Sequence, residues 1–387
     1  MPESKNSQLA LLASSLCNIG PDTVLLSKNT RMPLNKLRMK YWEYFVSRNL
    51  KVQALPNMEK LQLRRVLVIM EVGPGCHPKF FDVMQHIGGI LYMTSFSETT
   101  IPFVYVAYFT LPSAAEAKIK NCFSRILDRF NVRKASWNSF TWYRRVPMNV
   151  CYFDFENSTW GDLPIRVQLP DMKPDEDADE WDDSSNRFDS LDLSIVKHLE
   201  FDAAMSANQI SRSVTSKFEY AKICDNKRDK LSKVVCYHKA NHVIRRKLIN
   251  GYSIDWTRAA VNTNDIWRPI TQYVTISIII DKLTRDELDT VTSTTSTIPF
   301  LWAEASGDGK YFARFHVPCY KVEDIRIKLT TLADSDSLLI ELGGRRAVFG
   351  LNTSCYDNDA GWMFDEMSVA SVIREKTLDA CIPSALL

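Results

Sequence analysis

Two stretches of this sequence, 34–49 and 231–244, combine an apolar helical stripe with a face of basic and polar side chains. Such a face can reach base edges in the DNA major groove, while neighbouring lysines and arginines contact phosphates. The candidate DNA-contacting residues are Asn35, Lys36, Arg38 and Lys40 in the first stretch, and Ser232, Lys233, Tyr237 and Lys239 in the second. Binding of this kind should weaken steeply with salt. For each basic residue, a solvated helix face is the alternative.

Three further groups of residues have spacings that suggest ligand binding. Gly307-Asp308-Gly309 separates two expected strands, so it is either a hairpin turn or a backbone segment that approaches a small ligand. His238 and His242 share one helical face, but the sequence offers no third ligand and no H-E-x-x-H motif. Gly73-Pro74-Gly75 follows a strand without the later glycine of a dinucleotide-binding loop. We therefore expect no metal site, and a small-ligand site only at residues 307–309.

The sequence carries no motif of an enzyme active site. It has no G-x-x-x-x-G-K-[ST] or G-x-S-x-G motif, and no nucleophile, base and orienting group that cluster along the chain. We therefore expect a protein that is not an enzyme and needs no cofactor.

Each basic stretch leads into a turn and a short alternating segment, 50–55 in the first case and 248–256 in the second. Helix, turn and strand in this order are typical of the second half of a winged helix-turn-helix. Amphipathic segments upstream, 7–17 and 191–199, predict the preceding helices. Residues 206–209 are expected to form a capping box at the start of the helix between segment 191–199 and the second basic stretch.

Behind each winged unit the hydrophobic pattern predicts the order strand, helix, strand, strand, helix, strand. This βαββαβ order is typical of the ferredoxin-like fold. The first series is expected at 64–72, 79–90, 91–97, 103–111, 114–130 and 134–144. The second is expected at 272–280, 284–295, 298–305, 311–318, 322–333 and 337–350, the last range holding two short strands.

The two series align without gaps through much of their length. Val66 corresponds to Tyr273, and Tyr105 corresponds to Phe312 at the same offset. A constant offset through strand and helix indicates an internal duplication. The expected fold is α+β, with two tandem units that each contain a winged helix-turn-helix and a ferredoxin-like domain. The expected boundaries are 1–60 and 61–150 for the first unit, 151–188 for an acidic linker, 189–258 and 268–352 for the second unit, and 353–387 for a C-terminal tail.

Composition places the chain among globular proteins. Hydrophobic residues make up 45% of its 387 residues and the net charge is +2, so nucleic-acid contacts must come from local patches. The nine cysteines include no C-x-x-C pair, which favours reduced thiols and a cytoplasmic location. No signal peptide or membrane-spanning run is evident. The acidic segment 171–186 is either a solvated linker or an arm that competes with DNA for a basic surface.

The second unit also carries a set of residues that resembles a known family. The set is Leu191-Asp192, Ile195, Leu199, Asp202, Ser206, Gln209-Ile210-Ser211, Leu248-Ile249-Asn250-Gly251-Tyr252 and Gly307-Asp308-Gly309-Lys310-Tyr311. With these residues the chain resembles the Lrp/AsnC (feast/famine) transcription regulators of bacteria and archaea, as a divergent archaeal relative. The resemblance covers about 190–350 directly and 7–148 through the repeat. Two features depart from the family. Segment 216–230 is longer than the turn of the family's helix-turn-helix, and the first unit has residues 97–100 where the second unit has its glycine loop.

The resemblance implies a sequence-specific DNA-binding transcription regulator whose ferredoxin-like domains sense a ligand or dimerise. Expected partners are double-stranded DNA, a small-molecule effector, and a second copy of the chain unless the two units form an intrachain pseudo-dimer; no membrane is expected. The expected location is cytoplasmic and nucleoid-associated. Two alternatives stay open: a nucleoid-type or RNA-binding protein with little sequence preference, since the aromatic-rich 137–143 could stack bases, and a protein-interaction scaffold built on degenerate helix-turn-helix units.

Overall fold

The computed structural model describes residues 5–130, 132–165, 188–215, 228–258, 260–263, 266–269, 272–333 and 337–378. The acidic segment 171–186, most of the long turn 216–230 and the end of the expected tail lie outside the described residues. None of the described helices is long and apolar enough to cross a membrane.

The first helical unit packs three helices and ends in a strand. It contains α1 (Lys5–Ile19), α2 (Thr23–Thr30), α3 (Leu34–Tyr44), the short 3-10 turn η1 (Val46–Arg48) and β1 (Lys51–Pro56). Asp22 starts α2 because its carboxylate accepts hydrogen bonds from the backbone of Val24 and Leu25. The buried faces of α1 and α3 meet in one core that includes Leu9, Leu37 and the fully buried Phe45.

The second helical unit repeats this order. It contains α6 (Ser190–Phe201), α7 (Ala207–Thr215), α9 (Arg228–Tyr237), a π-helical turn η5 (His238–Ile244) and β9 (Ile249–Asp255). Asp189 and Asp192 form a reciprocal capping box at the start of α6. The expected capping box at Ser206 and Gln209 is confirmed, since each side chain bonds the other residue's backbone N–H.

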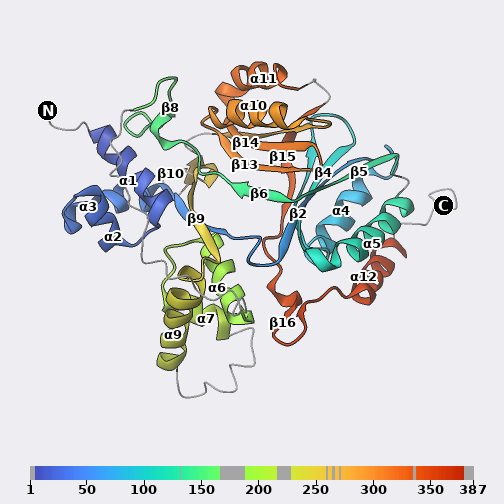
Figure 1. The fold of residues 1–387 in the computed structure, drawn as a ribbon, viewed down its shortest axis with the longest axis horizontal. Helices are drawn as coiled ribbons and strands as arrows, with labels where there is room; N and C mark the ends of the chain where they lie inside the picture. Colours follow the sequence, from blue (N-terminus) through green and yellow to red (C-terminus); the bar gives the residue numbers. More distant parts are fainter. Residues whose placement is uncertain are drawn as a thin grey trace.

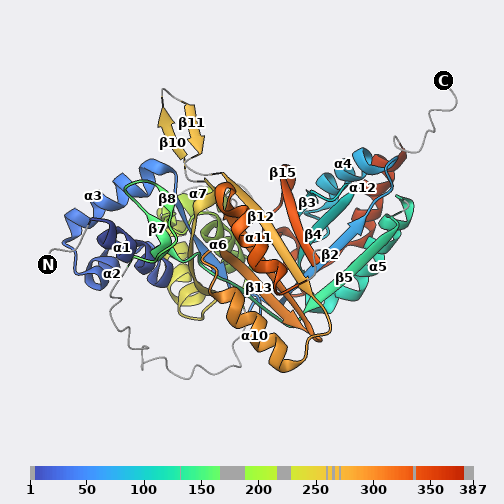
Figure 2. The same ribbon diagram turned by 90° about the horizontal axis from the view of Figure 1, so that it is seen from above.

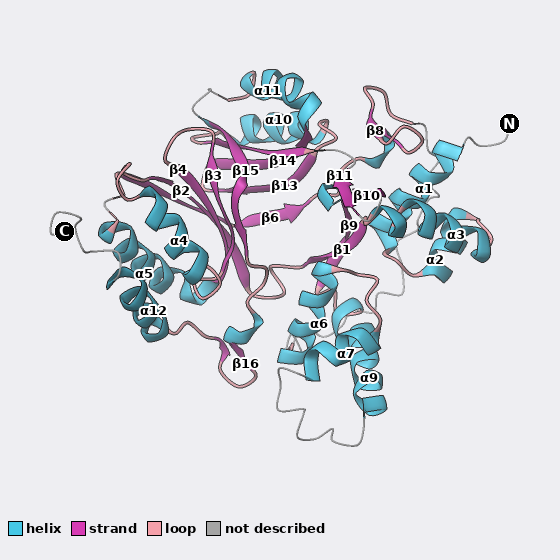
Figure 3. Ribbon diagram, turned by 180° about the vertical axis from the view of Figure 1, so that it is seen from behind, coloured by secondary structure: helices cyan, strands magenta, loops and turns pink. Residues whose placement is uncertain are grey.

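The segments expected to be wings pair with each other rather than folding back as separate hairpins. β1 and β9 run antiparallel from Lys51 opposite Asp255 to Pro56 opposite Ile249. Figure 3 shows these two strands side by side between the helical units. The two halves of the chain are therefore joined through backbone hydrogen bonds at this point.

In the described part of the chain, nine strands form one continuous sheet that includes both halves, and the fold class is α+β. The first half supplies β2 (Leu63–Glu71), α4 (His77–Ile87), β3 (Met93–Thr99), β4 (Val104–Pro112), α5 (Glu116–Arg129), β5 (Lys134–Phe140) and β6 (Trp142–Arg145). The second half supplies β12 (Tyr273–Ile280), α10 (Arg285–Ser296), β13 (Leu301–Gly307), β14 (Lys310–Pro318), α11 (Val322–Thr330) and β15 (Leu338–Val348). The strand order is β5-β2-β4-β3-β15-β12-β14-β13-β6.

Two strands cross from one half to the other. Range 337–350 holds the single strand β15 rather than two strands: its start pairs with β12, while Arg346–Val348 pairs with β3 of the first half. In the same way β6 continues from β5 and pairs with β13 of the second half. The duplicated halves thus exchange equivalent strands, as expected of an intrachain pseudo-dimer.

Aromatic and aliphatic side chains from both halves meet on the inner faces of the sheet. Leu67, Tyr108 and Phe140 of the first half share a buried cluster with Phe312 of the second. The Phe312 ring lies 5.9 Å from that of Tyr108 and 5.8 Å from that of Phe140. The helices α4, α5 and α12 (Glu366–Leu378) cover one part of the sheet, and α10 and α11 cover another (Figures 1 and 2).

A short motif after each half repeats as well. η3 (Val150–Tyr152), β7 (Phe153–Asp154) and β8 (Thr159–Trp160) correspond to η9 (Thr353–Cys355), β16 (Tyr356–Asp357) and β17 (Gly361–Trp362). Each motif begins with an asparagine cap, Asn149 or Asn352. The first motif falls in the range expected to be a linker, yet its Trp160 is buried against Trp256. An antiparallel hairpin, β10 (Ala260–Thr263) and β11 (Ile266–Pro269), follows β9.

Candidate functional site: an arginine-rich cavity

A cavity of about 1020 Å³ lies between the sheet and the second helical unit. Its lining includes residues of the sheet strands β2, β4, β6, β13, β14 and β15 and of helix α6. Lys197, His198 and Phe201 of α6 line it, as does Asp255 at the end of β9. Both halves of the chain and the β1–β9 ladder therefore contribute to this one cavity.

Cationic side chains dominate the lining of this cavity. Among the described residues, five arginines and one lysine line it, against the two carboxylates of Glu200 and Asp255. Asp255 is already paired with Arg258 at 3.0 Å. The whole chain has a net charge of only +2, so positive charge is concentrated at this site.

Five buried nitrogen atoms of the lining have no hydrogen-bond partner among the described residues. They are the Nε atoms of Arg65, Arg145, Arg314 and Arg346 and the Nε2 atom of His316. Buried N–H donors are satisfied in nearly all folded proteins, because leaving one unpaired costs free energy. Several donors left unpaired around one cavity indicate a site whose hydrogen-bond acceptors come from a ligand.

Stacking with aromatic rings holds these cations in place. The Arg145 guanidinium lies 3.8 Å from the centre of the Trp302 ring, and Trp302 stacks on His316 at 4.7 Å. Arg314 lies 4.0 Å from the centre of the Tyr108 ring, and Arg65 lies over the ring of Tyr143. Cation–π contacts of this kind orient a guanidinium without neutralising its charge.

Glu341 anchors the deepest of the four arginines. Its carboxylate accepts a hydrogen bond of 2.7 Å from Arg314, and both side chains are almost fully buried. Tyr108 and Ser97, both of the first half, donate to the same carboxylate at 2.7 Å. One carboxylate thus fixes residues from β3, β4 and β14, and the position of Arg314 depends on both halves of the chain.

The titratable groups of the cavity are shifted in ways that follow from this environment. Burial lowers the pKa of Arg145 and of Arg346, which favours the arrival of a compensating anion. Burial acts in the same direction on Arg314, but Glu341 and Tyr108 outweigh it and raise its pKa. Burial and the neighbouring arginines hold the pKa of His316 well below its ordinary value of 6.5. The imidazole is therefore neutral at pH 7.

The residues expected to contact DNA lie on α3 and α9 and its extension, away from the cavity. Asn35, Lys36, Arg38, Lys233 and Tyr237 are exposed, and Ser232 is half-buried. Lys40 is buried and donates to Gln8 at 3.0 Å, and Lys239 is half-buried and donates to the Met205 carbonyl. None of these residues lines the cavity.

Gly307-Asp308-Gly309 forms the tight turn between β13 and β14. Asp308 and Gly309 have φ values of 51° and 71°, as a two-residue hairpin turn requires. A Cβ atom on Gly307 would lie 2.9 Å from the backbone nitrogen of Thr141, so this glycine allows β13 to approach the segment between β5 and β6. The turn does not line the cavity.

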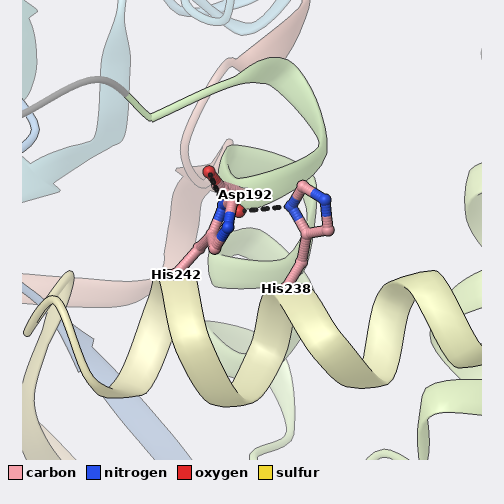
Figure 4. A group of neighbouring side chains, drawn as sticks. All are labelled: Asp192, His238 and His242. Carbon is pink, nitrogen blue, oxygen red and sulfur yellow. Dashed lines mark hydrogen bonds and ion pairs between the residues drawn. The ribbon is translucent and has the colours of Figure 1, made fainter. Parts of the chain in front are cut away.

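His238 and His242 do have a neighbouring carboxylate that sequence spacing did not reveal. Asp192, on α6, lies 2.8 Å from Nδ1 of His238 and 3.3 Å from Nδ1 of His242 (Figure 4). The three side chains are grouped closely enough to hold one metal ion. The third group of this cluster, which is not evident from the sequence spacing, is therefore Asp192.

No family model matches this sequence, and no curated protein matches it. Among solved structures, the crystal structure of the siroheme decarboxylase NirDL is 13% identical, with a TM-score of 0.48 and coverage of 96% of this chain and 99% of that chain. The same protein in co-complex with an iron-uroporphyrin III analogue is 12% identical, with a TM-score of 0.48 and coverage of 95% and 99%. The crystal structure of PH0061 is 17% identical, with a TM-score of 0.27 and coverage of 38% of this chain and 98% of that chain. The solved structures similar to this chain thus include those of an enzyme, NirDL, and the expectation that the chain is not an enzyme is not kept.

Proposed function

We propose that the chain is an enzyme and that the arginine-rich cavity binds its substrate, a large polycarboxylate. The observation that carries this proposal is the set of unpaired arginine Nε donors around one cavity. Arginine is the side chain best suited to hold carboxylates, because its planar N–H groups match the two carboxylate oxygens. Buried cations without nearby anions are costly, so each carboxylate that enters relieves that cost.

The size of the cavity favours a large substrate over a small amino-acid effector. Sites for drug-sized ligands span roughly 300 to 1000 Å³, and this cavity has about 1020 Å³. Its aromatic lining, which includes Tyr108, Phe140, Tyr143 and Trp302, adds apolar surface against which a conjugated ring system can pack. A carboxylated tetrapyrrole, the chemical class of siroheme, combines this size with several carboxylates and a flat apolar body.

Decarboxylation is the reaction that these groups support best. When a carboxylate leaves as CO₂, the carbon that remains must gain one proton, and the neutral, buried His316 can relay that proton from solvent. The carboxylates that stay are those bound to arginine, because an ion pair stabilises the carboxylate more than the CO₂ that would form from it. We therefore assign substrate binding to Arg145 and Arg346 and proton transfer to His316.

The test is to incubate the purified chain with a carboxylated tetrapyrrole under anaerobic conditions and to follow the products by mass spectrometry. The parent should form products that have each lost one CO₂. His316→Phe should keep substrate binding and lose turnover, whereas Arg145→Met should lose both. Arg326→Met, which changes an arginine on α11 that does not line the cavity, should behave like the parent. Binding without turnover in every variant, including the parent, would reject the enzyme.

We also propose that the helical units keep the winged helix-turn-helix arrangement of Lrp/AsnC proteins and that each sheet half is ferredoxin-like. Three helices before a strand among the described residues of each unit support the first point. The strand orders β5-β2-β4-β3 and β15-β12-β14-β13, which place the four strands of each half as fourth, first, third and second, support the second point.

Sequence-specific DNA binding is a second candidate function, supported by the exposure of Lys36, Arg38 and Lys233 on α3 and α9. A salt-dependent titration of DNA with Lys36→Ala plus Arg38→Ala tests it. That double variant should bind more weakly than Lys118→Ala plus Lys120→Ala, which changes exposed lysines on α5. Equal affinity of the two double variants would remove α3 as a DNA-contacting helix.

A further inference from the structure

The cluster of Asp192, His238 and His242 is separate from the cavity, although α6 contributes to both. Asp192 and the cavity-lining Ser194 and Lys197 lie on the same helix. None of the three cluster residues lines the cavity. The cluster therefore needs an explanation of its own.

Local helix geometry directs both histidines at Asp192. They belong to the π-helical turn η5, which extends α9 and widens its last turn. The two imidazole rings lie 4.3 Å apart and both turn their Nδ1 atoms toward α6, as Figure 4 shows. π-Helical turns occur preferentially at functional sites, where they reposition side chains. Here the turn brings two nitrogen ligands to one carboxylate.

The capping box of α6 also holds the carboxylates of Asp189 and Asp192 in position beside these histidines. Asp192 Oδ2 accepts from the Asp189 backbone at 3.1 Å, and Asp189 Oδ1 accepts from the Asp192 backbone at 2.8 Å. The other oxygen of each residue faces His238: Asp192 Oδ1 lies 2.8 Å and Asp189 Oδ2 lies 3.8 Å from its Nδ1 atom. Helix capping thus fixes both carboxylates beside the histidines, and the capping oxygen of Asp192, Oδ2, also lies 3.3 Å from Nδ1 of His242.

From this geometry we propose that Asp192, His238 and His242 bind a divalent transition metal ion of the Zn²⁺ class, with Asp189 or water as the fourth ligand. Two imidazoles and one or two carboxylates match the ligands that zinc takes in proteins, whereas Mg²⁺ and Ca²⁺ prefer oxygen alone. Tetrahedral zinc with bonds of about 2.0–2.1 Å places its ligand atoms roughly 3.3 Å apart. The three ligand atoms already lie within 4.8 Å of one another, so small side-chain rotations complete the site.

Burial fits a bound ion. Asp192 is 1% exposed, while His238 and His242 are 15% and 21% exposed. The carboxylate is thus shielded from water, and the ion would enter from the side of the histidines. Once bound, the ion would join α6 to the end of α9 and hold the second helical unit against the wall of the cavity.

The experiment measures Zn²⁺ binding to the full chain, first stripped of metal and kept reduced, by competition with a chromophoric chelator. The parent should bind one equivalent of Zn²⁺ that His238→Gln and His242→Gln each bind at least about 100-fold more weakly, since even outer-shell changes cost roughly 10- to 100-fold. His86→Gln, which removes an exposed histidine on α4, and Cys236→Ser, which removes an exposed thiol beside the cluster, should both keep the parent affinity.

A second readout separates loss of the site from loss of the fold. Zn²⁺ should raise the melting temperature of the parent and of His86→Gln, and should leave that of the two cluster variants unchanged. The far-ultraviolet circular dichroism of the metal-free proteins should be the same for all. Parent protein that binds no Zn²⁺, or cluster variants that bind it as tightly as the parent, would overturn the proposal and leave the histidines as hydrogen-bond donors to a buried carboxylate.

Discussion

Replacing His316 by phenylalanine should flatten the pH dependence of stability below pH 7. The ring of Phe keeps the stacking that His316 makes with Trp302 at 4.7 Å but cannot take up a proton. In the parent, burial and the charges of Arg314, Arg346 and Arg145 hold the pKa of His316 well below 6.5 in the folded state. The unfolded chain therefore binds one more proton than the folded chain whenever the pH lies below about 6.5 and above the folded pKa.

The size of the effect follows from that single proton. A folded pKa below the unfolded one means that the stabilisation is complete above pH 6.5 and is lost as the pH falls toward the folded pKa. For an unfolded pKa of about 6.5 and a folded histidine that stays neutral, the free energy of unfolding falls by about 1.4 kcal/mol between pH 7.5 and pH 5.5. Because His316→Phe lacks this titrating group, its free energy of unfolding should fall by about 1.4 kcal/mol less than that of the parent over the same pH interval.

Urea denaturation at pH 7.5, 6.5 and 5.5 measures this difference. Other titrating groups contribute to both proteins and cancel when the two pH profiles are subtracted. His86→Gln is the matched control, because it removes an exposed histidine from α4; its profile should follow that of the parent. Parallel profiles for the parent and His316→Phe would show that His316 is not held neutral in the folded protein, and would refute the proton-transfer role assigned to it.

Three further changes test the packing around the cavity and between the halves. Arg314→Met leaves Glu341 buried and uncompensated, so it should destabilise the protein by about 3–5 kcal/mol; the double change with Glu341→Gln should cost less than the sum, measured by urea denaturation. Gly307→Ala places a methyl group against the backbone of Thr141 and should cost about 1–3 kcal/mol, measured as a fall in the urea midpoint. Trp256→Ala removes one ring from a buried aromatic cluster and should lower the free energy of unfolding by about 3–5 kcal/mol. The melting temperature of Trp256→Ala should lie below that of the conservative variant Trp256→Phe, and equal melting temperatures would count against this prediction.

Sequence periodicity predicted the helices and strands of both halves because each hydrophobic pattern is local. The amphipathic pattern of 114–130 became α5 at Glu116–Arg129, and the helix expected at 284–295 became α10 at Arg285–Ser296. The repeat also left an intrachain pseudo-dimer open as an alternative to a homo-oligomer. Pairing between the halves could not be predicted, because nothing local in β1 specifies β9 as its partner, and nothing local in β3 specifies the second part of β15.

The cavity escaped sequence reasoning for a related reason. Arg65, Arg145, Arg314 and Arg346 lie on four strands that are far apart in the chain, so no spacing connects them. One local signal was present: Arg314 and His316 alternate within the otherwise apolar strand β14, which places two polar side chains on the same inner face. Polar residues at core positions of a strand often mark a site, and this pair was the detectable part of it.

The most direct test of the central claim is a titration of the protein with a fluorescent carboxylated porphyrin, followed by quenching, for the parent and for Arg145→Met plus Arg346→Met. Each charge-assisted hydrogen bond contributes about 1.5–3 kcal/mol, so loss of both arginines should raise the Kd by at least about 100-fold. Arg326→Met, which changes an exposed arginine outside the cavity lining, should leave the Kd unchanged. Equal Kd values for the parent and the double variant would contradict the account, because the porphyrin would then bind somewhere other than the arginine-rich cavity.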